Sequence, residues 1–175
     1  MNYAIDRELL FDILNGTETP LYGLVPPGIV NPATGKDFRE EGGNLAKYDL
    51  EEAKRLLAEA GYPDGAGFPK LTYIYNSNQR HDDTATALKD MWKKLGIDVD
   101  LAVRDWSIFL EERAWKGKFE IARHAMSADY SDPTTYLGMY NSTSTQNEAH
   151  VNNPEYDRYY NLASNETDIA TRIDK

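Results

Sequence analysis

The chain has 175 residues, which is enough for one ordinary domain with a substantial hydrophobic core. Acidic residues outnumber basic ones, 29 to 19, and the net charge of −10 argues against nucleic acid as a partner. There is no cysteine, which excludes disulfides, thiolate metal sites and a cysteine nucleophile. No apolar run approaches the roughly 18 residues that a membrane helix needs, and no clean apolar segment of a signal peptide opens the chain.

The first third of the chain predicts a helix, a long loop and a second helix. Apolar residues recur at helical spacing over residues 4–14, and Gly16 is a plausible stop. Residues 17–48 hold four of the eight prolines and predict a long loop without a regular element. Such loops are often functional or packed on another domain. Asp49 is expected to be the N-cap of a helix that ends before Gly61.

Strands and helices alternate along the rest of the chain. Three strands are expected, at residues 70–77, 97–103 and 119–126. Three further helices are expected, at residues 82–96, 106–117 and 153–165. Strand–helix–strand units predict an α/β fold with at least partly parallel pairing. Neither a glycine-rich P-loop nor an HExxH motif is present, and the sequence predicts no metal site and no cofactor.

The stretch "ARHAMSADYSDP" (residues 122–133) carries charges that suit a zwitterionic ligand. Strand alternation would place Arg123 and Asp129 on one face, about 20 Å apart at roughly 3.3 Å per residue. An extended tripeptide spans only about 10 Å, so a short peptide would reach both only if the chain bends after Ser127 or if the long arginine side chain reaches inward. A carboxylate suits an ammonium group, and a guanidinium suits a carboxylate.

The same residues also have a purely structural interpretation, which composition alone favours because charged residues are usually exposed and contribute little individually. In that interpretation Asp129 caps a following turn. Arg123 then pairs with Glu120 or Glu112 at the surface.

Other polar residues have similar alternatives. His81 follows the first predicted strand, and its structural interpretation is a surface histidine that precedes an N-cap at Asp82 or Asp83. Asp98 and Asp100 look like an acid pair, but their spacing places them on the solvent face of a strand. General acid–base chemistry is therefore not expected there.

Three segments carry a family resemblance: "NYAIDRELL…GTETPLYGLVPPGI", "YDLEEAKRLLAEAGYPDG" and "FEIARHAMSADYSDPTTYL". Together they resemble the C-terminal lobe of an oligopeptide-binding protein, a family-5 extracytoplasmic solute-binding protein of a peptide ABC transporter. The resemblance implies one lobe of a type II periplasmic-binding-protein-like fold, with a mixed sheet flanked by helices. It also implies that residues 1–175 form a single, excised lobe that is truncated at its C-terminus.

The resemblance also implies roles for four residues of this chain. Asp129 matches the aspartate that binds the peptide α-ammonium, and Arg123 matches an arginine that helps to hold ligand carboxylates. Arg113 is similar to a second arginine, with one extra residue between it and Phe119. His81 resembles a histidine that meets the C-terminus of a longer peptide.

The implied function is capture of extracellular oligopeptides and their delivery to the membrane permease subunits of an ABC importer, in the periplasm or at the cell surface. A monomer without enzymatic activity is expected. One alternative is another cargo, such as a dipeptide, a cell-wall peptide, a sugar or a metal chelate, although Asp129 argues for an amino group and against sugars. Two further alternatives are a hydrolase that uses Asp129 and Asp132, and a receptor or adhesion domain.

Overall fold

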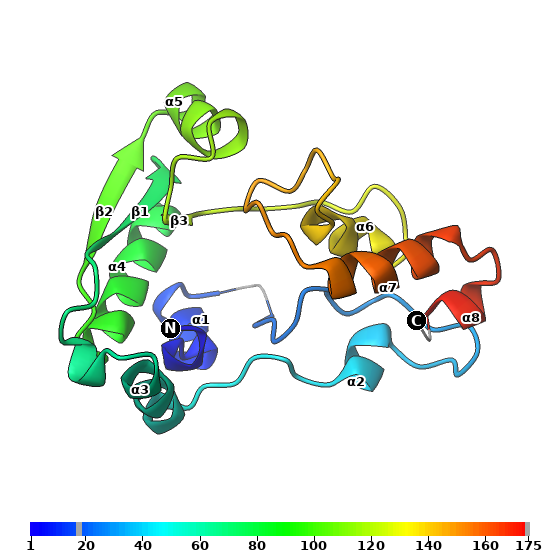
Figure 1. The fold of residues 1–175 in the computed structure, drawn as a ribbon, viewed down its shortest axis with the longest axis horizontal. Helices are drawn as coiled ribbons and strands as arrows, with labels where there is room; N and C mark the ends of the chain where they lie inside the picture. Colours follow the sequence, from blue (N-terminus) through cyan, green and yellow to red (C-terminus); the bar gives the residue numbers. More distant parts are fainter. Residues whose placement is uncertain (17–18, 174–175) are drawn as a thin grey trace. The chain divides into compact units, whose positions relative to one another are not determined.

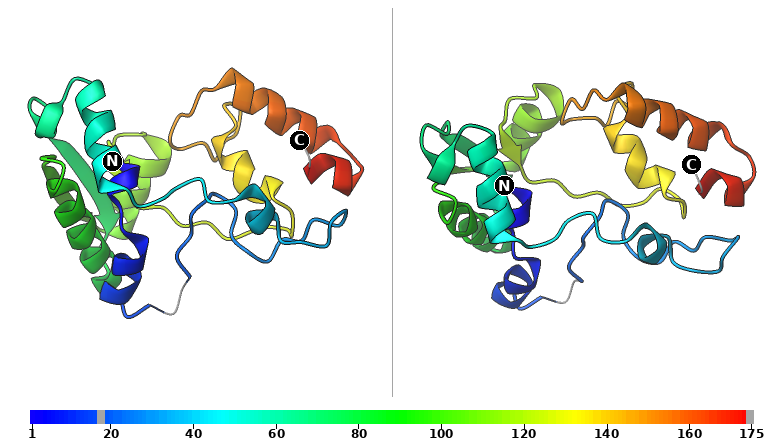
Figure 2. Two further views of the ribbon diagram at one scale, coloured as in Figure 1. Left: turned by 90° about the horizontal axis from the view of Figure 1, so that it is seen from below. Right: turned by 60° about the horizontal axis from the view of Figure 1, so that its bottom comes forward.

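The computed structural model describes residues 1–16 and 19–173, which divide into two compact units (Figure 1, with two further views in Figure 2). The first unit comprises Met1–Tyr22 and Ala46–His124. The second comprises Gly23–Leu45 and Ala125–Lys175. Each unit is therefore built from two separate segments of the chain. That the whole chain forms a single lobe stays a prediction.

The first unit is built on a three-stranded sheet with the order β2-β1-β3. Its strands are β1 (Leu71–Asn76), β2 (Val99–Arg104) and β3 (Ile121–Ala122). Both pairings are parallel, with Leu71 opposite Val99 and Tyr73 opposite Ile121. The α/β class is thus confirmed, whereas the mixed sheet that was expected is parallel throughout the described residues.

Helices complete the first unit. They are η1 (Asn2–Ala4), α1 (Arg7–Ile13), α3 (Leu50–Glu59), η2 (Pro63–Gly65), α4 (Gln79–Lys93), α5 (Trp106–Leu110) and a π-helical turn, η3 (Glu111–Trp115). None of the helices in the described part of the chain is long and apolar enough to cross a bilayer.

The core of this unit lies between the sheet and its helices. Residues of the central strand β1 are buried in an unbroken run, as expected for a strand with neighbours on both sides. The buried core residues include Ala53, Leu57, Tyr73, Tyr75, Ala85, Trp92, Leu95, Ile97 and Val99. The alternation predicted along β2 is correct at Ile97 and Val99, but Val103 is half-exposed because the strand ends at the rim of the sheet.

Polar caps set several helix boundaries. The Asp49 carboxylate accepts a hydrogen bond from the Glu52 N–H at 3.0 Å, which confirms Asp49 as the N-cap of α3. Gly61 has φ +94°, as expected for the residue that follows the helix. Helix α4 begins at Gln79 with Asn78 as its N-cap, so the boundary expected at Asp82 or Asp83 is wrong. The side chain of Asn78 supplies the cap a full turn earlier.

Two further predicted elements are shorter or less regular in the structure than expected. The helix expected over residues 106–117 is a short α-helix that continues as the π-helical turn η3, with Asp105 at its N-terminus. The strand expected over residues 119–126 pairs only at Ile121–Ala122. The backbone N–H of Arg123 still donates to the Ile74 carbonyl at 3.0 Å, and the chain then leaves the sheet.

The second unit contains short helices, and among its described residues the only strand-like pairing is an isolated antiparallel bridge between Val30 and Asp37. Its helices are α2 (Phe38–Gly42), α6 (Thr134–Leu137), η4 (Gly138–Tyr140), α7 (Pro154–Asn165) and α8 (Ile169–Ile173). Helix α2 lies inside the segment expected to lack regular structure. Asp37 caps it by accepting a hydrogen bond from the Arg39 N–H at 2.7 Å.

Helix α7 agrees with the helix expected over residues 153–165. Asn153 is its N-cap, and Pro154 occupies the first helical position. The Tyr156 hydroxyl donates to the Leu137 carbonyl at 2.7 Å, which ties α7 to the end of α6. Burial raises the pKa of Tyr156 to about 12, so this hydroxyl keeps its proton throughout the neutral range.

Candidate functional site

Basic side chains gather at the carboxyl edge of the sheet in the first unit. Because all three strands are parallel, their carboxyl ends meet at one edge, the usual position for ligands in open α/β sheets. Arg104 ends β2, Arg123 follows β3, and His81 lies in the first turn of α4, just after β1. Two of the four predicted site residues therefore reach this edge through the topology of the sheet.

Arg123 is half-buried beside the aromatic core. Burial raises the pKa of the Tyr73 hydroxyl, and the positive charge of Arg123 opposes that rise, which places the guanidinium near this ring. The two partners expected for a structural role bind other groups: Glu120 accepts from the Thr72 N–H at 2.9 Å, and Glu112 pairs with Arg104 at 2.9 Å. Neither described carboxylate is paired with Arg123.

Arg113 lies next to Arg123. Its Nη1 donates to the Arg123 carbonyl oxygen at 3.4 Å, and its guanidinium lies over the Phe109 ring, 5.1 Å from the centroid. The residue is only 8% exposed. Arg113 belongs to the π-helical turn, whose wider backbone accommodates an additional residue. The extra residue between Arg113 and Phe119 is therefore compatible with a position of Arg113 beside Arg123.

His81 is held by the end of the first strand. Its Nδ1 lies 3.1 Å from the Asn76 carbonyl oxygen. A carbonyl can only accept, so Nδ1 carries the proton and Nε2 remains available to another group. His81 is half-buried inside α4 rather than ahead of its N-cap, so the structural interpretation of this residue is wrong.

Asp129 belongs to the second unit and is exposed. Its backbone N–H donates to Thr135 Oγ1 at 3.2 Å. Among the described residues of this unit, none forms a hydrogen bond or ion pair with its carboxylate. Asp132, not Asp129, accepts hydrogen bonds from the following turn, through the Thr134 N–H and hydroxyl at 3.0 and 2.7 Å. The capping role considered for Asp129 is therefore wrong.

The Asp129 side chain borders a polar cavity of about 280 Å³. The other lining residues are Tyr130, Thr134, Thr135, Gly138, Asn141, Thr143, Ser144, Gln146, Tyr160 and Asn161. Among these described residues Asp129 is the sole charged one. Hydroxyl and amide groups around a single carboxylate suit a cationic group such as an ammonium.

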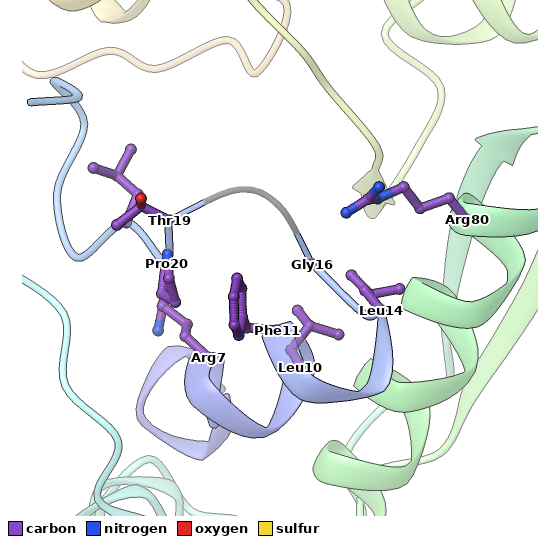
Figure 3. A pocket seen from close by; sticks show the side chains of 9 residues that line it. Arg7, Leu10, Phe11, Leu14, Gly16, Thr19, Pro20 and Arg80 are labelled. Atoms are coloured by element: carbon purple, nitrogen blue, oxygen red, sulfur yellow. The ribbon is translucent and has the colours of Figure 1, made fainter.

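A second cavity, of about 250 Å³, lies in the first unit beside α1 (Figure 3). Figure 3 shows Leu10 and Phe11 on α1, and Leu14 directly after it, facing the same space as Pro20, with Arg80 extending from the start of α4. The lining also includes Arg7, Gly16, Thr19 and Leu21. This cavity was not predicted, although the apolar spacing in residues 4–14 was a signal for an apolar wall there. An apolar wall with guanidinium groups nearby suits an apolar group that carries an anion.

The structure brings Arg113 and Arg123 together, places His81 at the same sheet edge, and places Asp129 in the other unit. No sequence pattern indicated Arg104 or Thr135. The acid pair Asp98 and Asp100 lies on the solvent side, and both carboxylates pair with Lys70 there. Over the described residues, no cluster of histidine and acidic side chains could hold a metal ion.

Comparisons with known proteins agree on one family. The sequence model of the bacterial extracellular solute-binding proteins, family 5 (middle), matches residues 1–148. The dipeptide-binding protein DppE of Bacillus subtilis is 34% identical over 173 residues. The periplasmic murein peptide-binding protein MppA of Escherichia coli is 34% identical over 178 residues. These alignments cover 97% and 98% of this chain but 32% of each relative, so the chain spans about a third of their length.

Solved structures give the same result. A periplasmic oligopeptide-binding protein of Borrelia burgdorferi matches with a TM-score of 0.85 and 33% identity, over 99% of this chain and 33% of that protein. The substrate-binding domain of an oligopeptide ABC transporter from Bacillus anthracis matches with a TM-score of 0.90 and 28% identity, over 99% and 34%. The α/β architecture described above is thus shared with these proteins.

Proposed function

We propose, because the chain belongs to the family 5 bacterial extracellular solute-binding proteins, that it forms part of an oligopeptide receptor that serves an ABC importer. The observation that carries the proposal is the complementary charge of the two candidate subsites. Asp129 offers a carboxylate without a described partner in a polar cavity of the second unit. The first unit offers Arg113 and Arg123 side by side, with His81 at the same sheet edge.

Each subsite matches one terminus of a free peptide. Asp129 binds the α-ammonium group through a charge-assisted hydrogen bond. Arg123, Arg113 and His81 of the first unit each suit the carboxylate at the other end. The ligand side chains lie in hydrated pockets, where bridging water accommodates varied groups and permits low sequence selectivity.

The proposed location is extracytoplasmic, either in the periplasm or at the cell surface. This is supported by relatives that are named periplasmic oligopeptide-binding proteins in Salmonella typhimurium and Escherichia coli. The partners are an oligopeptide and the permease subunits, and the protein acts as a monomer without catalysis. We infer that residues 1–175 form one lobe of a two-lobed receptor, whose closure is favoured only by ligands that contact both lobes. The chain alone then binds peptides weakly.

Other functions have less support. A hydrolase with a carboxylate pair would need both Asp129 and Asp132 to face a substrate. Asp132 is only 8% exposed, and its carboxylate accepts hydrogen bonds from Thr134 and from Arg172. Two relatives, DppE and MppA, are named for a dipeptide and a murein peptide, which also carry an ammonium group when their amino end is free. Two others are named for cargo of another kind, a probable deoxycholate-binding protein and a heme-binding protein, at 32% and 30% identity. A carboxylate in a polar cavity favours an ammonium group over either of these.

An NMR amide titration with tri- to pentapeptides tests the proposal. We expect shifts around residues 125–135 that are lost when the peptide is N-acetylated, because acetylation removes the charge that Asp129 binds. Asp129→Asn should weaken binding of the free-amine peptide at least about tenfold, since a charge-assisted hydrogen bond is lost. Unchanged affinity after either modification would remove Asp129 from the ammonium site. Glu155→Gln, an exposed change in the first turn of α7, serves as the matched control.

A further inference from the structure

A chain of hydrogen bonds in the second unit runs from helix α8 to Asp129. Arg172 Nη2 on α8 donates to Asp132 Oδ2 at 2.6 Å. The other carboxylate oxygen of Asp132 accepts from the Thr134 N–H and hydroxyl at the start of α6. Both Asp132 and Arg172 are largely removed from solvent, with 11% and 23% of their side chains exposed.

The next link fixes the backbone of Asp129. The Thr135 N–H donates to the Asp132 carbonyl oxygen at 3.2 Å, so Thr135 is held by the residue that Arg172 binds. Thr135 is 5% exposed, and its hydroxyl oxygen accepts the backbone N–H of Asp129 at 3.2 Å. A buried hydroxyl thus holds the N–H of an exposed residue whose own carboxylate has no described partner in this unit.

From these contacts we propose that Thr135 and Arg172 are positioning residues for the ammonium-binding carboxylate of Asp129. The inference rests on the proposed function. Asp129 lies on a turn, where no strand or helix holds its backbone. The direction of its carboxylate therefore depends on the hydrogen bond to Thr135, and the position of Thr135 depends on the ion pair between Asp132 and Arg172.

Loss of the hydrogen bond to Thr135 and loss of the ion pair with Arg172 should have different effects on the fold. The hydrogen bond from Asp129 to Thr135 orders a single exposed residue, so its loss affects the ligand more than the fold. The ion pair holds a buried carboxylate, and removal of the arginine leaves an uncompensated charge near α6. Arg172→Gln should therefore loosen α6 together with the Asp129 turn, whereas Thr135→Val should loosen the turn alone.

The test compares the affinities of one tripeptide in free-amine and N-acetylated form, measured by NMR titration of the 175-residue chain. The ratio of the two affinities reports the ammonium contact and is insensitive to a general loss of binding. Thr135→Val should reduce this ratio about fivefold to tenfold, as expected when one hydrogen bond is lost. Thr135→Ser keeps the hydroxyl and should restore the ratio. In the Asp129→Asn background, Thr135→Val should change the ratio no further.

Arg172→Gln should also reduce the ratio, and Arg158→Gln provides the matched control. Arg158 lies on α7 of the same unit, where its guanidinium covers the Tyr159 ring at 4.1 Å. Its removal should leave the ratio unchanged. If Thr135→Val unfolds the chain, the arginine pair and Thr135→Ser still decide the question, because each folded variant gives a ratio.

The outcomes distinguish a failure of the positioning role from a failure of the proposed function. If Asp129→Asn abolishes the preference for a free amine but Thr135→Val and Arg172→Gln do not, the positioning role is wrong and the proposed function stands. Equal weakening of both peptides in the Thr135 and Arg172 variants would also overturn it, since that is a general structural effect. If wild type shows no preference for the free amine, the ammonium site itself fails, and the positioning role falls with it.

Discussion

Asp49 illustrates how much one side chain contributes to local structure in this chain. Its carboxylate accepts the Glu52 N–H at 3.0 Å and pairs with Lys47 at 3.1 Å. The backbone hydrogen bond, followed by the lysine, lowers the pKa of Asp49 below its ordinary value of 3.8. The cap was predictable because its signature is local, with an aspartate directly before an amphipathic run.

A lowered pKa gives Asp49 a defined effect on acid stability. Its contribution is present above the unfolded-state pKa near 3.8 and is lost as the pH falls through the lower folded-state pKa. Asp49→Asn keeps an acceptor at the cap but cannot titrate. We expect the urea midpoint of this variant to fall less steeply than that of wild type between about pH 4 and pH 2.

Asp90→Asn, an exposed change on α4, controls for the general loss of negative charge. Urea unfolding at several pH values, followed by circular dichroism, gives both slopes. Identical slopes for wild type and Asp49→Asn would show that the cap does not titrate differently in the folded state.

The site residues were less predictable than the caps. Arg123 and Asp129 stood out because opposite charges occurred near a turn signal. The orientation of His81 depends on Asn78, which starts α4 a turn earlier than the acidic residues suggested. Thr135 could not be recognised, because a threonine in a predicted turn has no distinctive pattern and the role that we propose for it arises from a contact with Asp129.

At the level of elements, Gly65 and Gly96 allow the backbone of the turn after α3 to approach closely the backbone of the turn between α4 and β2. Gly96 has φ +75°, and a Cβ atom at this position would lie 2.0 Å from the Asp64 carbonyl oxygen. A Cβ atom at Gly65 would lie 2.5 Å from the Gly96 carbonyl oxygen. Neither backbone segment can accept a side chain here without moving the other.

Gly96→Ala should therefore lower the free energy of unfolding by more than the backbone strain alone would. A positive φ costs an alanine about 1–2 kcal/mol, and the clash adds about 1–3 kcal/mol. Gly61→Ala is the matched control in the same unit, with φ +94° and no atom within 4 Å of the added Cβ. Free energies of unfolding from urea titrations should separate the two variants, and equal losses would rule out the close approach.

Elements with strong local patterns were predicted correctly, and elements that depend on neighbours were not. Helices α3 and α7 have N-caps and amphipathic faces, and both lie where expected. The third strand has suitable strand formers over residues 119–126, but pairing with β1 stops after Ala122. Strand propensity gives a residue's suitability for a sheet, while the length of a strand depends on the neighbouring backbone.

For the whole molecule, the sequence resemblance to family 5 solute-binding proteins is confirmed by the match over residues 1–148. The division into two units was not foreseen. It arises because the segment Gly23–Leu45 belongs to the same unit as the C-terminal segment. The segments that flank it in the sequence belong to the other unit. Prolines and glycines in this segment indicated a loop but carried no signal for where it packs.

The two units should differ in local stability. The first unit contains a paired sheet with a continuous aromatic and aliphatic core, whereas the described part of the second has short helices and a single isolated bridge. Native-state hydrogen exchange should give β1 and β2 opening free energies near that of global unfolding, and lower values for α6 and α8. Equal values throughout would indicate that the units unfold as one cooperative block.

The interleaved order of the segments has a consequence for synthesis on the ribosome. Residues 23–45 emerge before residues 46–124, yet the other segment of their unit, residues 125–175, follows only after these. At about 5–20 residues per second, this early segment waits several seconds for its partners. The sheet unit can fold first, since both of its segments, Met1–Tyr22 and Ala46–His124, precede residues 125–175 in the chain. The Asp129 carboxylate, which we propose binds the peptide ammonium group, is thus among the last of the proposed binding groups to reach its folded surroundings.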